Sequence, residues 1–125
     1  MQKNVKNFEA QLFNEAVNAE LSYIRQLGSN DNLILASANL GAYEALLIIL
    51  SGGEAGVPVY QAVTSVRSRF SSQAGIISRI RLMRQAGLLV EKPGVKKSQV
   101  CLAPSEQLLQ KLEPILRNKY YGDVG

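Results

Sequence analysis

The sequence contains no histidine and a single cysteine, Cys101, among its 125 residues. One cysteine cannot form an intramolecular disulfide, and without histidine or a second thiol it has no partner with which to bind zinc. These absences exclude histidine-based catalysis and a zinc site. No nucleophile paired with a base, metal-binding cluster or cofactor-binding loop occurs elsewhere. We therefore expect a protein that is not an enzyme and that holds no metal or cofactor.

Long hydrophobic runs are also absent. The apolar run 46–50 is far too short to span a bilayer, and the chain does not open with a charged segment followed by an apolar stretch and a cleavage site. We expect a cytoplasmic protein with no membrane contact. An apolar content of 46%, with only 6% aromatic residues, fits one soluble domain with a modest core.

Acidic residues are scarce in one part of the chain. Residues 57–100 hold eight basic residues and one acidic residue, Glu91, a net charge of +7, whereas the remainder holds six basic and nine acidic residues, a net charge of −3. So polarised a surface attracts polyanions, of which phosphate backbones are the commonest. A solvated basic face without a partner is the alternative, but the basic residues coincide with a specific pattern of elements.

Apolar residues recur at three- and four-residue spacings near the N-terminus, which predicts a long helix with a broad apolar face. They are Phe8, Leu12, Phe13, Ala16, Val17, Leu21, Ile24 and Leu27. The face covers more than one side of the helix, so we expect the excess to meet a second subunit. The polar cluster 28–32 reads as a turn that ends the helix. Residues 1–32 are therefore predicted to be a dimerisation helix and its turn.

Two shorter helices are predicted next. Residues 39–50 form an apolar helix buried nearly all round, with Ser37 or Asn39 as its N-cap and residues 52–53, two glycines, as its stop. Pro58 suits the first turn of another helix, which reaches about residue 68. Its predicted inward residues are Ala62, Val63 and Val66.

The next predicted helix, residues 72–86, carries the arginines. Ser71 and Ser72 offer hydroxyl caps, and Gly87 ends the helix. Inward positions are Ile76, Ile80 and Met83, with Ile77 beside them, and outward positions are Ser78, Arg81 and Arg84. The strand-like runs 88–92 and 99–103 follow, joined by residues 93–98. Because that connection contains Pro-Gly and two lysines, it predicts a hairpin with a basic tip.

A final helix is predicted to open at Pro104, with a kink or break at Pro114. Its apolar side consists of Leu108, Leu109, Leu112, Ile115 and Leu116. The expected fold class is mainly α with a small β-hairpin. It forms a single domain that comprises the N-terminal helix and turn (1–32), a central unit (39–103) and a C-terminal helix and tail (104–125).

The central unit has the geometry of a DNA-binding motif. A helix that packs inward on a preceding helix across a tight turn, with arginines and small polar groups outward, can lie in a DNA major groove. Arginines on such a face neutralise phosphates or pair with guanine edges. The hairpin, with Lys96 and Lys97 at its tip, would reach the neighbouring minor groove or the backbone. We therefore predict a winged helix-turn-helix with residues 72–86 in the major groove and residues 93–98 as the wing.

From residue 39 to residue 112 the chain resembles the MarR-type winged-helix transcriptional regulators. The resemblance rests on the order of the elements and on the run R-I-R-L-M-R-Q-A-G-L-L-V, since in that family G-L-V or G-L-I after the recognition helix begins the wing. A long N-terminal helix builds the dimer in that family. The resemblance implies a homodimeric regulator that binds double-stranded DNA and that senses a small-molecule effector in the crevice between the dimer helices and the DNA-reading parts.

Carried over by position, the resemblance also implies the contacts with DNA. Six residues would face bases or nearby phosphates: Ser72, Gln73, Ala74, Gly75, Ser78 and Arg81. Lys96 and Lys97 would form the wing contact, and Arg67 and Arg69, at the end of the preceding helix, would touch the backbone. Arg79 falls near the inner stripe, where it either reaches a phosphate or pairs internally.

Two other functions stay open. A winged helix can bind DNA for replication, partition or plasmid maintenance instead of gene regulation. It can also serve protein contacts only, with its basic face against an acidic partner.

Overall fold

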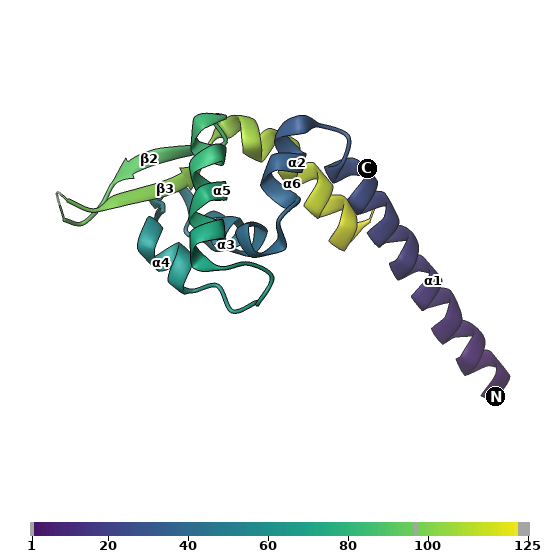
Figure 1. Ribbon diagram of the computed structural model, residues 1–125. Helices are drawn as coiled ribbons and strands as arrows, with labels where there is room; N and C mark the ends of the chain where they lie inside the picture. The colour runs from purple at the N-terminus through teal and green to yellow at the C-terminus, as the bar shows by residue number, and fades with distance from the viewer. Residues whose placement is uncertain (1, 97, 123–125) are drawn as a thin grey trace.

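The computed structural model describes the backbone of residues 2–96 and 98–122, and the side chains within that span from residue 7 onward. It is mainly helical, with one small antiparallel sheet. The helices are α1 (Gln2–Leu27), α2 (Asp31–Ser37), α3 (Leu40–Ser51), the 3-10 helix η1 (Gly53–Ala55), α4 (Val59–Thr64), α5 (Gln73–Gln85) and α6 (Glu106–Tyr121). The strands are β1 (Val57–Pro58), β2 (Leu89–Pro93) and β3 (Val100–Pro104). In Figure 1, α1 projects from one end of the body and the β2–β3 hairpin from the other.

The sheet is ordered β1-β3-β2, and both pairings are antiparallel. Leu102 of β3 lies opposite Glu91 of β2 on one side and opposite Val57 of β1 on the other. The predicted hairpin is therefore present, with each strand displaced by one residue from the expected bounds. β1 was not predicted, because two residues are too few to show the alternation that indicates a strand.

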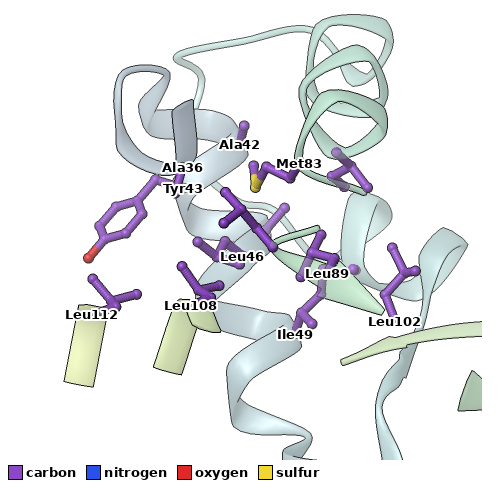
Figure 2. Packing of buried hydrophobic residues seen from close by; sticks show 14 of the residues in the cluster. Ala36, Ala42, Tyr43, Leu46, Ile49, Met83, Leu89, Leu102, Leu108 and Leu112 are labelled. Atoms are coloured by element: carbon purple, nitrogen blue, oxygen red, sulfur yellow. The ribbon is translucent and has the colours of Figure 1, made fainter. Parts of the chain in front are cut away.

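Helix α3 lies at the centre of the core. It contacts α2, α4, α5 and β3, and its Ala45, Leu46 and Ile49 have no exposed surface. Figure 2 shows side chains from α5, the sheet and α6 gathered around Leu46 and Ile49. The prediction that this helix is buried nearly all round is wrong for one side, since Leu40 is 51% exposed and Leu47 is 39% exposed.

Polar side chains begin most of the helices, as the sequence indicates. Asn39, not Ser37, caps α3, with its Oδ1 accepting the N–H of Ala42 at 2.9 Å. Of the two candidate caps Ser71 and Ser72, Ser72 caps α5. Ser105 caps α6 by accepting the N–H of Leu108 at 3.1 Å. The predicted opening of the last helix at Pro104 is wrong, because Pro104 is the last residue of β3 and has no side-chain acceptor with which to cap a helix.

Helix α6 continues without a break through Pro114. A proline removes one backbone hydrogen bond, and here Leu112 and Ile115 on either side of it remain buried against the core. Burial of that face holds the helix together, so the break that the sequence suggested does not occur.

Helix α2 occupies part of a segment that the sequence predicts as a turn. Only Gly28 and Ser29 form the turn, and Asn30 caps α2 with its Oδ1 accepting the N–H of Asn32 at 2.9 Å. Leu33 and Ala36 of α2 are buried. Asn favours both turns and helix N-caps, so the local sequence did not distinguish the two.

Helix α4 is shorter than predicted. It ends at Thr64 instead of about residue 68, and α5 begins at Gln73. The two helices are thus joined by residues 65–72, and the tight turn expected between them is wrong. Arg67 and Arg69 lie in this connection and not at the end of a helix. The early end is stabilised by Glu44 of α3, which binds the backbone of the connection.

The inward stripe of α5 can be tested on two neighbouring residues. Met83 is fully buried and Leu82 is 45% exposed. Met83→Ala should lower the free energy of unfolding by roughly 2–5 kcal/mol, because it removes a packed side chain and leaves a cavity. Leu82→Ala should cost clearly less, because alanine favours helices and nearly half of the Leu82 surface already faces water. Chemical denaturation of both variants measures the difference, and equal losses would mean that the stripe is misplaced.

Candidate nucleic-acid interface

The outward face of α5 is small, polar and basic. Ile76, Ile80 and Met83 are buried, which confirms the predicted inward positions. Ile77, expected beside them, is 41% exposed. The predicted contact residues on the other face are exposed or half-buried; they are Ser72, Gln73, Ala74, Gly75, Ser78, Arg79 and Arg81. The face that the sequence predicts for DNA is therefore accessible on α5.

The first turn of α5 is fixed by its cap and by the end of α3. Ser72 Oγ accepts the N–H of Gly75 at 3.1 Å. The neighbouring Ser71 Oγ donates to Asn39 Oδ1 at 2.6 Å. A Cβ on Gly41 would lie only 2.8 Å from the Cβ of Ser71, so only glycine allows α3 to approach the connection this closely. These contacts hold the start of α5 against the start of α3.

Glu44 of α3 binds the backbone of the connection 65–72. Its Oε2 accepts the N–H of Arg67 at 2.6 Å, and its Oε1 accepts the N–H of Ser68 at 3.0 Å. The nearby hydroxyl of Ser68 and these two N–H groups lower the pKa of Glu44 from its ordinary value. Arg67 and Arg69 are both exposed. The carboxylate thus fixes the backbone from which these two arginines project beside the start of α5.

The β2–β3 hairpin follows the end of α5, where Gly87 adopts a left-handed conformation with φ 78°. Its tip is held by two backbone hydrogen bonds, from Gly94 N–H to the carbonyl of Gln99 and from Gln99 N–H to the carbonyl of Lys96. Lys96 is exposed. Lys97, the other predicted wing contact, lies outside the described residues. In Figure 1 the hairpin extends from the body beyond α5.

Arg84 and Glu91 form an ion pair between α5 and β2. Glu91 is the one acidic residue in the basic segment, so this pair neutralises one of its arginines. Arg84, Arg81 and Leu89 line a hollow of about 410 Å³. The sequence did not predict this pair. Arg84 and Glu91 are only seven residues apart, and the turn at Gly87 between them brings the end of α5 and the start of β2 together.

Arg79 is half-buried and forms no ion pair with the described acidic residues. Internal pairing of Arg79 is therefore not seen among the described residues, and its contact with a phosphate stays a prediction. Exposed basic residues thus occur in the connection before α5, on α5 itself and in the hairpin after it.

Comparison with models of known protein families, with curated proteins and with solved structures found no match for this chain. The described residues contain no group of three or more His, Cys, Asp and Glu side chains that could hold a metal ion. Within the same residues no single helix is long and apolar enough to cross a bilayer, and α2 with α3, bent by 97°, reaches that length and composition only as a pair.

The hydrogen bonds of Glu44 predict that the free energy of unfolding depends on pH. Because folding lowers the pKa of Glu44 below its ordinary value of 4.5, the stabilisation by this carboxylate is present above pH 4.5 and is lost as the pH falls through the lower pKa of the folded state. Glu44→Gln should therefore destabilise the protein at about pH 6. The difference between the wild-type and variant free energies of unfolding should shrink toward about pH 3. Denaturant titrations across this range measure it, and a difference independent of pH would contradict the proposed role of the carboxylate.

Proposed function

We propose that the protein is a winged-helix DNA-binding protein and acts as a homodimeric transcriptional regulator. The observation that carries the proposal is α5, whose buried stripe packs on α3 while its other face presents Gln73, Ser78 and Arg81 to solvent. The basic connection before α5 and the basic hairpin after it flank this face. In this proposal α5 lies in the major groove, and the hairpin contacts the minor groove or the backbone.

The shape of α5 supports this placement. A B-DNA major groove, about 12 Å wide, admits one α-helix. Ala74 and Gly75 in the first turn leave room for that turn to approach base edges, and Ser72 and Gln73 supply short polar groups. Arg67 and Arg69 on one side and Lys96 on the other would neutralise phosphates and fix the register of the helix.

The homodimer is supported by α1. On α1 four apolar side chains are between 40% and 69% exposed, namely Phe8, Leu12, Phe13 and Val17. A continuous apolar surface of this kind marks a contact with another protein surface. A two-fold dimer would present two copies of α5 to successive major grooves, so its site would be an inverted repeat.

The test is selection of bound fragments from a random pool of genomic DNA at moderate salt, followed by sequencing. The proposed regulator should enrich an inverted repeat with half-sites roughly 10 base pairs apart, centre to centre. Enrichment near replication or partition sequences would instead support a role in DNA maintenance. Failure to enrich any DNA, with binding only to acidic proteins, would contradict the proposal.

Arg81 offers the sharpest test of base reading. Its planar guanidinium suits the O6 and N7 edge of guanine, which neither lysine nor glutamine matches. Arg81→Ala should cost about 1–3 kcal/mol on the selected site and much less on unrelated DNA. Arg25→Ala, an exposed arginine on α1, is the control for the change in charge and should leave both affinities nearly unchanged. Fluorescence anisotropy measures both, and equal losses on the two DNAs would reassign Arg81 to a phosphate.

The ion pair between Arg84 and Glu91 predicts a gain of binding. Glu91→Gln frees Arg84 for a phosphate, so affinity for DNA of any sequence should rise, and the log-log salt slope should steepen by roughly 0.9 for one more neutralised phosphate. Glu106→Gln makes the same change of charge at the start of α6 and is the matched control. Titrations at several salt concentrations measure the slope. If both variants change it equally, the effect is one of net charge and not of Arg84.

A further inference from the structure

The two halves of α1 lie in different surroundings. Its C-terminal half contacts α6 and buries Tyr23 and Leu27 in the core. Residues 7–18 are exposed throughout, and we call this segment the arm. Figure 1 shows α1 running away from the body toward the N-terminus. The arm nevertheless carries Phe8 at 61% exposed and Phe13 at 69% exposed, so large apolar side chains face water where the described part of the chain offers no cover.

A second apolar surface lies open beside the other half of α1. A groove of about 780 Å³ runs between α1, α3 and α6. Ile24, Leu40, Leu47 and Leu109 line it and are 38–55% exposed. Charged side chains, among them Arg117 and Lys119, also line it. The groove is therefore mainly apolar with a few charged groups, a composition that a protein interface also has.

Contacts between three helices fix the shape of the groove. The hydroxyls of Tyr23 on α1 and Tyr43 on α3 form a hydrogen bond in its wall, and burial raises the pKa of Tyr23 far above its ordinary value. Lys119 Nζ lies 3.8 Å from the centre of the Tyr23 ring and 2.9 Å from Glu20 Oε2. Because α1, α3 and α6 are joined at this point, the groove is formed before any partner arrives.

The arm and the groove match in length. Leu40 and Leu47 on α3 are seven residues apart, as are Leu109 and Leu116 on α6, so each wall presents apolar side chains two turns apart, about 10 Å along the helix. The stripe from Phe8 to Val17 extends over about 14 Å at 1.5 Å per residue. The apolar stripe of one arm is therefore long enough to contact both leucines of each wall.

The arm cannot enter the groove of its own chain. Ile24 lines the groove, and α1 is one uninterrupted helix from Gln2 to Leu27. Because a continuous helix does not fold back, the arm leads away from the groove by about 1.5 Å for every residue before Ile24. Only a second molecule can bring an arm to this groove.

We infer that the arm of one protomer occupies the groove of a second copy, and that the exchange is reciprocal. This inference rests on the homodimer of the proposed function and names its contact surfaces. The C-terminal half of α1 borders the groove, so the arm of each α1 lies beside the C-terminal half of the other. The two α1 helices therefore run antiparallel, about a two-fold axis perpendicular to them. The four apolar side chains of the arm and the four of the groove offer roughly 100 Å² each, about 800 Å² per protomer, which is the size of a standard stable interface.

Photocrosslinking in the absence of DNA tests the exchange directly. A photoreactive p-benzoylphenylalanine replaces Phe13, and this chain is mixed with an equal amount of unmodified chain labelled with ¹⁵N. Irradiation should join the probe at position 13 to labelled peptides that carry Leu47, Leu109 or Leu116, which proves contact between chains. The same probe at Tyr60, an exposed aromatic on α4, is the matched control and should give few crosslinks. Crosslinks only between the two arms, or only within one chain, would overturn the inference.

Charge substitutions supply a second, independent readout. Phe13→Glu in the arm and Leu47→Glu in the groove should each weaken dimerisation at least about 100-fold in sedimentation, because each buries an unpaired carboxylate in an apolar contact. Tyr60→Glu should not. Both target residues are exposed, so the monomers should keep their helical circular dichroism. A variant that stays dimeric with Glu at either position would contradict the exchange.

An apolar fluorescent dye distinguishes the arm from a small ligand as the occupant of the groove. The wild-type dimer should bind little dye, and Phe13→Glu should bind severalfold more because its groove is open. Equal binding to both would show that the groove is free for a small molecule, which overturns the inference. A dimer whose arms crosslink in the groove but that selects no DNA contradicts the proposed regulator alone, whereas a dimer that selects an inverted repeat but gives no crosslinks between arm and groove contradicts the exchange alone.

Discussion

Burial of α3 is the packing interaction on which the arrangement of the other elements depends. Ala45, Leu46 and Ile49 have no exposed surface, and α2, α4, α5 and β3 all rest on this one helix. Because α5 and β3 share it as a support, the spacing between the exposed face of α5 and the hairpin is set by side chains far from either surface. A change of volume in α3 would therefore shift both parts of the candidate interface together.

The ends and edges of the same helix carry polar groups that order the interface. Asn39 caps α3 and also accepts a hydrogen bond from Ser71, and Glu44 holds the backbone of Arg67 and Ser68. The N–H groups of Ser65 and Val66 still bond to carbonyls of α4, but residues 67–71 lie in no helix or strand, so the contacts with Glu44 and Asn39 hold the connection there. One helix thus packs the core with one side and fixes an irregular segment with another.

Local signals in the sequence predicted α5, its cap at Ser72 and the hairpin, because apolar spacing, N-caps and turn glycines act over a few residues. The same reasoning failed where the deciding contact is distant in sequence. α4 ends early because Glu44, on another helix, binds the backbone after it. The groove joins α1, α3 and α6, and no local pattern shows that Leu47 and Leu109 line one space. The identity of any bound DNA is likewise outside what such local patterns can indicate.

The order β1-β3-β2 leaves two edges on the sheet, and both discourage the addition of further strands. β1 is two residues long and ends in Pro58, which has no N–H to donate. β2 carries Glu91 and Lys92 and ends in Pro93. Charges, prolines and short length are the means by which natural sheets avoid edge-to-edge aggregation. A protein whose hairpin extends into solvent can therefore accumulate in its folded form without templating fibres through that hairpin.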